Sequence, residues 1–193
     1  MIIVLHGFGS NGTDSSTCNL IEQAFPDEVV LRPTYTSEDP HKAHKELRKF
    51  LADHITLGDE LLFVGISLGG FWARHFANEW PGSKLVMLNP SIMPAYHLQK
   101  RIGENMSYAT GEKFTLTEVA VYDFKTFTGL KDRPDLDVYL VLAKDDTEVP
   151  INIAYDKYLG RADITITAGG HRLKGQEDLI EGVVLRALNT FRN

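Results

Sequence analysis

The sequence of 193 residues contains a single cysteine, Cys18, and no excess of basic side chains. One cysteine excludes an intrachain disulfide, and nothing suggests secretion into an oxidising compartment. The formal net charge of −6 argues against a nucleic-acid surface, which normally shows a basic excess on one face. We therefore expect a small-molecule partner and no nucleic acid, while protein partners stay unspecified.

Long apolar runs are also absent, since none approaches the ~20 residues that a membrane-spanning helix needs. The first apolar run, residues 1–5, is too short for a signal peptide and has no basic segment before it. With 43% hydrophobic and 24% charged residues, the composition is typical of one globular domain over residues 1–193. The expectation is a cytoplasmic protein that does not associate with a membrane.

Short β-branched apolar runs alternate with stretches of helical periodicity, which is typical of a parallel sheet with crossover helices. The expected strands lie at residues 2–5, 29–32, 60–65, 84–88, 137–143 and 163–167. The expected helices lie at residues 15–24, 40–54, 68–80, 151–158 and 176–191. The pattern predicts an α/β fold with about six parallel strands and helices on both faces of the sheet.

A serine stands where one expected strand passes into a helix, in the segment Gly65-Ile66-Ser67-Leu68-Gly69, which fits G-x-S-x-G. Such a turn strains the serine backbone and lifts the hydroxyl clear of the sheet, and Gly65 and Gly69 avoid side-chain collisions there. The amide of Leu68 would then point outward at the positive end of a helix dipole, where it can stabilise an oxyanion. The alternative is a glycine-rich turn without chemistry.

A serine hydroxyl needs a base to remove its proton, and the base needs a carboxylate to orient it. His171, in the glycine-rich segment "TAGGHRLKG" after the last expected strand, is the best candidate for the base. Asp145, Asp146 and Glu148 follow the preceding strand, and the order serine, acid, histidine is that of an α/β-hydrolase triad. The competing interpretation is that these acids only cap the next helix.

The other histidines receive less specific interpretations. His6 lies in "VLHGFGSNG" after the first strand, and we expect it to be a buried residue that holds this loop while the amide of Phe8 supplies a second oxyanion donor. His41 and His44 could share a metal, but we expect no carboxylate or cysteine to complete such a site. His54, His75 and His97 carry no distinguishing signal. We therefore expect neither a metal nor an organic cofactor.

With these motifs the chain resembles the α/β-hydrolase superfamily, and within it the small esterase family called YqiA-like or UPF0227. The resemblance rests on "LHGFGSN", "GISLGG", "LNPSIMPAYHLQKRIGENMSYATGEKF" and "GGHRLKG". It implies ester hydrolysis with Ser67 as nucleophile, Asp146 as acid, His171 as base, and the amides of Phe8 and Leu68 as the oxyanion hole.

The resemblance also favours one acid over its neighbours. The superfamily often shows D-x-x-V-P after this strand, and residues 146–150 match that pattern. Asp145 is then expected at the surface or as a helix cap. Two departures are an alanine at position 143, where many relatives have glycine, and the absence of an aspartate directly before His171. The implied architecture is a minimal hydrolase with strand order 2-1-3-4-5-6.

The preferred function is a serine carboxylesterase that acts on small acyl esters. A thioesterase, peptidase or acyltransferase would share the same parts, and a noncatalytic binding protein with this fold is the alternative from another class. Residues 91–134 interrupt the regular order of strands and helices and are rich in methionine and aromatic side chains. We expect a cap in which Met93, Tyr96 and Phe124 line the acyl side of the cleft, the alternative being a cluster packed on the sheet edge.

Overall fold

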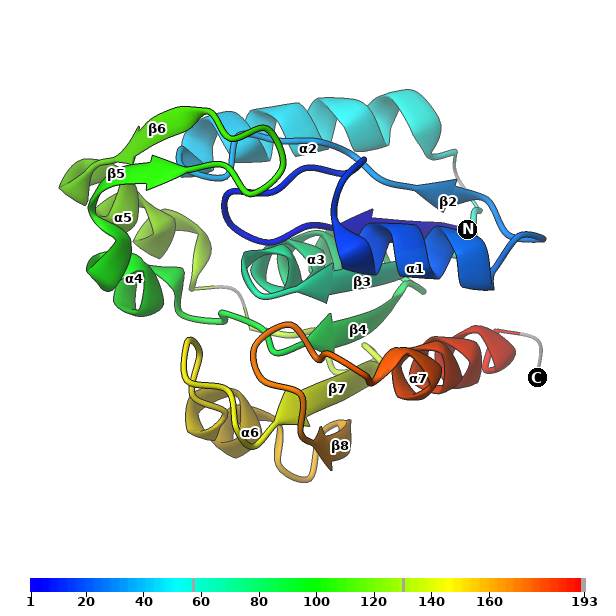
Figure 1. Cartoon of the computed structure of the whole chain (residues 1–193). Coiled ribbons are helices and arrows are strands. Elements are labelled where there is room, and N and C mark those ends of the chain that lie inside the picture. Colours follow the sequence, from blue (N-terminus) through cyan, green and yellow to red (C-terminus); the bar gives the residue numbers. More distant parts are fainter. Residues whose placement is uncertain (57, 130, 192–193) are drawn as a thin grey trace.

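The computed structural model describes residues 1–56, 58–129 and 131–191, and within them six parallel strands form one sheet (Figure 1). The strands are β1 (Ile2–Leu5), β2 (Val30–Leu31), β3 (Leu62–Ile66), β4 (Lys84–Leu88), β7 (Val138–Ala143) and β8 (Asp163–Thr167). Their spatial order, β2-β1-β3-β4-β7-β8, confirms the predicted order. The order reverses at β1, which pairs with both β2 and β3, so the loops that follow β1 and β3 meet at a topological switch point.

Helices cover both faces of this sheet, as predicted (Figure 1). Alternate residues of β1 belong to two separate cores because successive strand side chains point to opposite faces. Ile3 and Leu5 belong to the core with α2, α3 and α6, and Ile2 and Val4 belong to the core with α1 and α7. These helices are α1 (Ser16–Ala24), α2 (Pro40–His54), α3 (Leu68–Glu79), α6 (Asn152–Tyr158) and α7 (Glu177–Asn189).

The start of α2 shows how local sequence sets an element boundary. Asp39 has an extended backbone, and its Oδ1 accepts a hydrogen bond from the amide of Lys42 at 2.9 Å. Pro40 occupies the first helical position, where its missing N–H leaves no hydrogen bond unmade. Within the described residues, no helix is both long enough and apolar enough to cross a bilayer.

The insertion contains short helices and a hairpin that the sequence pattern did not predict. Its elements are α4 (Pro94–His97), the 3-10 helix η1 (Leu98–Arg101), β5 (Gly103–Met106), β6 (Lys113–Leu116), α5 (Glu118–Asp123) and the 3-10 helix η2 (Phe124–Phe127). Strands β5 and β6 pair antiparallel and form a separate two-stranded sheet. Both strands carry charged side chains on an exposed face, so neither has the apolar run of a central strand.

The hairpin is attached to the loop that follows β1. The amide of Tyr108 donates a hydrogen bond to the carbonyl of Gly9 at 2.7 Å. The rings of Phe8 and Phe114 meet edge to face, with centroids 5.4 Å apart. These contacts hold the insertion beyond the carboxyl ends of the central strands (Figure 1).

Candidate active site

Ser67 occupies a strained turn between β3 and α3. Its backbone has φ 55° and ψ −121°, a region that side-chain-bearing residues rarely adopt. A Cβ atom at Gly65 would lie 2.2 Å from the carbonyl oxygen of Gly69, and one at Gly69 would lie 2.0 Å from the carbonyl oxygen of Leu5. The two glycines are therefore required because the turn packs against its own backbone and against strand β1.

His171 joins the predicted nucleophile to the predicted acid. Its Nε2 lies 2.9 Å from the Oγ of Ser67, and its Nδ1 lies 2.7 Å from the Oδ2 of Asp146. With the proton on Nδ1, His171 donates to the carboxylate and leaves Nε2 free to accept a hydrogen bond from the Ser67 hydroxyl. The structure thus brings together the three side chains that the sequence singled out.

The carboxylate of Asp146 is fixed on both of its oxygens. While Oδ2 faces His171, Oδ1 accepts hydrogen bonds from the amides of Glu148 at 2.8 Å and Val149 at 2.9 Å. Burial acts to raise the pKa of Asp146, but the hydrogen bonds from His171 and these two amides outweigh it and hold the pKa below its usual value. The carboxylate is therefore ionised and oriented toward the imidazole.

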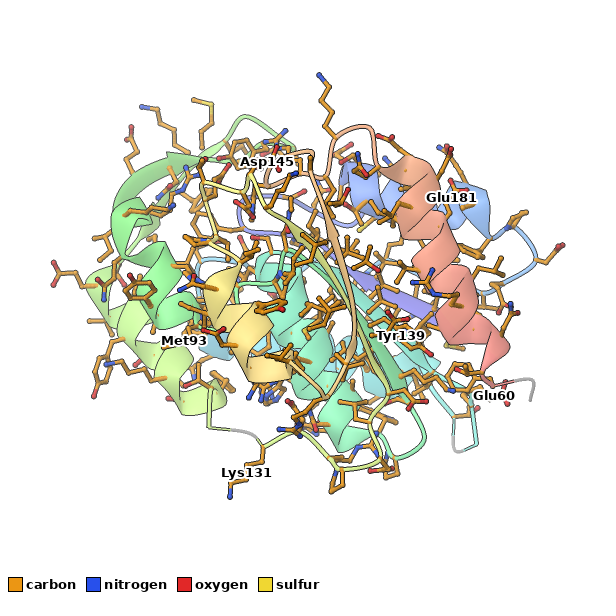
Figure 2. All side chains as sticks on the ribbon, turned by 90° about the horizontal axis from the view of Figure 1, so that it is seen from below. Glu60, Met93, Lys131, Tyr139, Asp145 and Glu181 are labelled. Carbon is orange, nitrogen blue, oxygen red and sulfur yellow. The ribbon has the colours of Figure 1, made fainter. Side chains whose placement is uncertain are left out.

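Asp145 supports the loop that carries His171, whereas the imidazole itself pairs with Asp146. Its two carboxylate oxygens accept hydrogen bonds from the amides of Gly169 at 3.2 Å and Gly170 at 3.1 Å. Figure 2 shows Asp145 at the opposite end of the molecule from Glu60, which precedes β3. Asp145 lies at the surface, which is one of the two alternatives expected for it, and its hydrogen bonds go to the histidine loop and not to a helix.

Asn89 has a positioning role that the sequence analysis missed. It is buried directly after β4, and its φ of 42° is unusual for a residue other than glycine. Its side-chain amide donates to the carbonyls of Gly170 at 3.0 Å and His171 at 3.1 Å, and its oxygen accepts from the amide of Ala143 at 2.7 Å. One side chain thus connects the ends of β4 and β7 to the histidine loop.

The loop after β1 forms a tight turn in front of Ser67. The amide of Ser10 donates to the carbonyl of Gly7 at 3.3 Å, and Gly9 has a φ of 67°, which favours glycine. Phe8 and Leu68 both line the cavity that contains the Ser67 hydroxyl. The two residues whose amides were predicted as oxyanion donors therefore both lie beside Ser67, Phe8 in the loop after β1 and Leu68 at the start of α3.

His6 is buried beneath this loop, as expected. Its Nδ1 donates to the carbonyl of Gly7 at 2.9 Å, and its Nε2 accepts from the amide of Tyr35 at 3.3 Å. Burial lowers the pKa of His6 to about 4, although the hydrogen bond to Gly7 partly opposes this. A neutral imidazole therefore holds the loop.

A cavity of about 250 Å³ opens at Ser67 between the loop after β1, the start of α1, the histidine loop and the insertion. The three insertion residues that were predicted to line it do not. Met93 and Tyr96 are 47% and 60% exposed, and Phe124 is fully buried against Phe71 and Trp72. The prediction of these residues is wrong because Met93 and Tyr96, at the start of and within α4, are exposed to solvent outside the cavity, while Phe124 fills the core. The insertion lines the cavity with His97, Leu98, Lys100, Arg101, Tyr108 and Ala109.

His97 is a second histidine in the cavity wall. Its Nδ1 lies 3.0 Å from the Oγ of Ser91, and the amide of Ser91 donates to the carbonyl of Ser67 at 2.9 Å. Burial lowers the pKa of His97, and the nearby Lys100 acts in the same direction. Ser91 thus connects the neutral ring of His97 to the backbone of Ser67. Nothing in the sequence separated His97 from the other histidines.

The cavity rim carries charged groups of both signs. The guanidinium of Arg101 pairs with the carboxylate of Glu148 at 2.9 Å, and Lys100 donates to the backbone carbonyl of Glu148 at 2.7 Å. The Arg172 guanidinium lies 5.0 Å from the ring centre of Tyr108. These contacts join the histidine loop and the segment after β7 to the insertion across the mouth of the cavity.

Groups that could hold a metal lie elsewhere. Among the residues that the structure describes, His44, His75 and Glu79 are the one set of three or more potential ligands that converge. This set contains His44 but not His41, the histidine that was considered with it from the sequence. In the fold, His44 on α2 converges with two residues of α3.

Solved structures with the α/β-hydrolase fold are similar to this chain over almost its whole length. A putative hydrolase from Agrobacterium vitis S4 has a TM-score of 0.76 at 17% identity, covering 96% of this chain and 87% of the other. The mouse alpha/beta hydrolase domain-containing protein 10 has a TM-score of 0.73 at 17% identity, covering 98% of this chain and 90% of the mouse protein. The Pyrococcus furiosus esterase PF2001 has a TM-score of 0.66 at 15% identity, covering 98% and 81%. These similarities confirm the predicted fold.

Curated relatives match a shorter segment. A UPF0227 protein from Serratia proteamaculans is 30% identical over 110 residues, which covers 56% of this chain and 60% of the relative. UPF0227 protein YcfP from Salmonella arizonae is 29% identical over 111 residues, covering 56% and 61%. The chain thus matches less than two thirds of the length of these relatives. The model of the "Uncharacterised protein family (UPF0227)" matches residues 1–185, and because this match spans almost the entire sequence, the chain belongs to the UPF0227 family.

Proposed function

We propose that the protein is a serine hydrolase that cleaves carboxylic esters with small acyl groups. The observation that carries this proposal is the position of His171, with Nε2 at 2.9 Å from Ser67 Oγ and Nδ1 at 2.7 Å from Asp146 Oδ2. The strained serine turn and the glycine-rich loop after β1 support the same chemistry. The similarity in fold to proteins named as hydrolases and as an esterase also supports it.

Acylation begins when His171 Nε2 takes the proton of the Ser67 hydroxyl and Oγ attacks the ester carbonyl carbon. The carbonyl oxygen becomes an oxyanion, which the backbone amides of Phe8 and Leu68 stabilise. Asp146 stays ionised and stabilises the imidazolium that forms. The C–O bond to the alcohol then breaks, the alcohol leaves with the proton from Nε2, and the acyl group stays on Oγ.

Deacylation repeats these steps with water as the nucleophile. His171 Nε2 takes a proton from water, and the resulting hydroxide attacks the acyl carbon. The second tetrahedral anion uses the same two amides. Its collapse breaks the bond to Ser67 Oγ, which recovers its proton from Nε2, and the carboxylic acid leaves.

The cavity supports a small acyl group as the substrate portion nearest Ser67. Its volume of about 250 Å³ limits the group that can be enclosed. Apolar side chains of Phe8, Ile66, Leu98 and Val149 contribute to its wall and suit an acyl chain. The charged rim leaves the alcohol portion, or the thiol portion of a thioester, at the solvent side.

A fluorophosphonate probe tests the nucleophile directly. The probe should label Ser67 with one equivalent per chain, located by mass spectrometry of the labelled peptide, and Ser67→Ala should not be labelled. Ser16→Ala is the matched control, because Ser16 also lines the cavity but contacts neither His171 nor Asp146 in the proposed mechanism. Labelling that persists in pure Ser67→Ala would refute the assignment. Once Ser67 is confirmed as the labelled residue, turnover of p-nitrophenyl and acyl-CoA esters of graded length would define the acyl group.

A further inference from the structure

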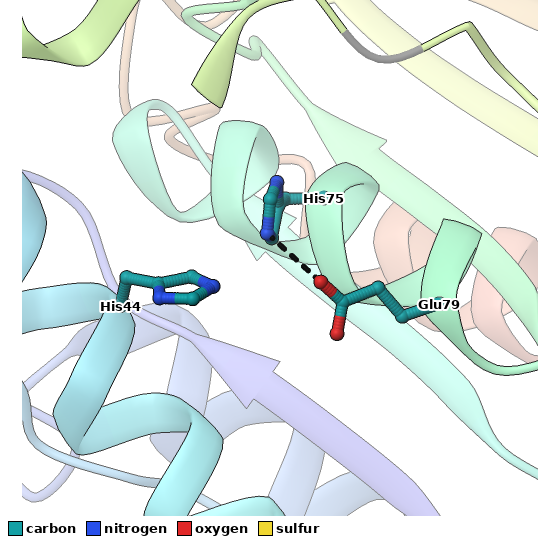
Figure 3. Close-up of side chains that lie close together, drawn as sticks. All are labelled: His44, His75 and Glu79. Carbon is teal, nitrogen blue, oxygen red and sulfur yellow. Dashed lines mark ion pairs between the residues drawn. The ribbon is translucent and has the colours of Figure 1, made fainter. Parts of the chain in front are cut away.

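Three potential metal ligands converge between α2 and α3, away from Ser67. Figure 3 shows His44 on α2 facing His75 and Glu79, which lie one turn apart on α3. The candidate ligand atoms of the three side chains all lie within 4.8 Å of one another. His75 lies eight residues after Ser67, which corresponds to about 12 Å of helix. The cluster is therefore separate from the candidate active site.

His75 is a buried polar side chain without an ordinary hydrogen-bond partner. It is 6% exposed, and within the described parts of the chain its polar neighbours are Glu79 Oε1, 3.2 Å from Nε2, and the backbone of Phe127, neither of which makes a hydrogen bond of normal geometry with the ring. Buried polar groups in proteins are nearly always paired, so an unpaired imidazole needs an explanation.

The distances suit a tetrahedral ion such as Zn²⁺. Zinc bonds of about 2.0–2.2 Å to nitrogen and oxygen place adjacent ligand atoms about 3.4 Å apart in a tetrahedral site. His75 Nε2 lies 3.2 Å from Glu79 Oε1, close to that separation. The ligand nitrogen of His44 lies at most 4.8 Å from the other two ligand atoms, so it must move at most about 1.4 Å closer to reach the tetrahedral separation. Rotation of its partly exposed side chain can provide this movement.

The surroundings of the cluster resemble those of a metal site. Arg48 Nη2 donates to both carboxylate oxygens of Glu79, at 2.7 and 2.6 Å, and such outer contacts usually orient a ligating carboxylate. The rings of Phe76 and Phe127 pack against both histidines and exclude water from that side. One side of the cluster, where His44 is partly exposed, remains open to solvent.

We propose that His44, His75 and Glu79 bind one divalent transition-metal ion of the zinc class, with a water molecule as the fourth ligand. Two imidazoles and one carboxylate are a donor set that zinc accepts readily. The ion joins α2 to α3, the helix that begins directly after Ser67. Its role is to stabilise the packing of these two helices, and the assignment is independent of the proposed esterase activity.

Metal binding is tested by titrating metal-stripped protein with Zn²⁺ in a calorimeter. The wild-type chain should bind one equivalent, and its melting temperature should rise by about 5–11 °C at a free metal concentration 100 times Kd. His44→Gln and Glu79→Gln should each weaken binding by at least about 10-fold, because even the loss of a residue that only hydrogen-bonds to a metal ligand typically lowers metal affinity by that factor. Both variants leave the buried His75 in place, and their folding can be checked by circular dichroism without metal.

Two control variants separate this site from adventitious binding. His54→Gln removes an exposed histidine from the same helix α2 and should retain the wild-type affinity. His171→Ala removes the imidazole beside Ser67 and should also retain it. Unchanged affinity in both His44→Gln and Glu79→Gln, loss of binding only in His171→Ala, or no stoichiometric binding by the wild-type chain would each overturn the assignment.

Discussion

Replacing Asp146 by asparagine tests how the carboxylate controls His171. In one orientation, the asparagine oxygen keeps the two hydrogen bonds from the amides of Glu148 and Val149, and its NH₂ group faces His171 Nδ1. Nδ1 must then act as the acceptor, so the proton moves to Nε2, which can no longer take the proton of Ser67. In the other orientation, the NH₂ group faces two N–H donors and both hydrogen bonds are lost.

The structure sets the balance between these orientations. Leaving buried donors unpaired costs about 1–3 kcal/mol each, so two of them favour the first orientation by at least about 2 kcal/mol, roughly 30-fold. Most molecules therefore hold the unproductive tautomer. The equivalent exchange in a serine protease lowers kcat by about 10⁴. We expect kcat/KM of Asp146→Asn for a p-nitrophenyl ester to fall by about 10³ to 10⁴.

Stability should change little, because the first orientation keeps both backbone hydrogen bonds of Asp146. Thermal unfolding followed by circular dichroism measures this. Asp145→Asn is the matched control, since it alters the neighbouring carboxylate, which contacts Gly169 and Gly170 and not the imidazole. It should remain active. If Asp146→Asn keeps more than a tenth of wild-type activity, or Asp145→Asn loses as much, the tautomer argument fails.

Four other changes have outcomes that follow from local geometry. Ser67→Gly removes an unfavourable positive φ and should raise the free energy of unfolding in urea by about 1 kcal/mol while abolishing activity; a lower stability would contradict the strain. Gly69→Ala places a Cβ 2.0 Å from a backbone oxygen of β1 and should cost about 1–3 kcal/mol of stability, whereas Gly182→Ala on α7, where a Cβ meets nothing within 4 Å, should not destabilise the fold; equal melting temperatures would count against the close approach. Asn89→Asp loses both donations to the histidine loop and should lower kcat about 100-fold with a smaller change in KM, and an unaltered kcat would exclude the positioning role. Because burial lowers the pKa of His6 to about 4 while the unfolded value is about 6.5, the unfolded chain takes up the proton first on acidification, and the contribution of His6 to stability should fall by about 2 kcal/mol between pH 7 and pH 5; a His6→Gln variant with the same pH slope as the wild type would refute this contribution.

The positions of Ser67 and His171 could be predicted because each depends on short-range sequence features, whereas the choice of Asp146 among three acids came from the resemblance to the superfamily. The serine turn needs glycines at fixed offsets, and those offsets can be read from the sequence alone. The carboxyl ends of parallel strands meet at one edge of a sheet, so residues that directly follow β3, β7 and β8 were expected to converge. The same logic predicted the strand order.

The residues that sequence reasoning missed depend on packing between distant segments. Asn89 directly precedes a proline, and its contact with the histidine loop spans more than 80 positions. Phe124 and Tyr108 are aromatic residues of the same insertion, yet one fills the core and the other lines the cavity. Hydrophobicity does not distinguish these two fates, because both give an aromatic ring a favourable environment. His75 was missed because its partner His44 belongs to another helix.

The hydrogen bond from the amide of Tyr108 to the carbonyl of Gly9 links the hairpin tip to the turn that presents Phe8. Both partners are backbone atoms, so among substitutions at these two positions only a proline at position 108, which has no N–H, deletes the bond itself. A bulky acyl group that pushes the hairpin outward must either break this bond or pull the turn with it. Under the proposed function, size discrimination at the cavity would be mechanically coupled to oxyanion stabilisation, and an oversized substrate would lose rate as well as affinity.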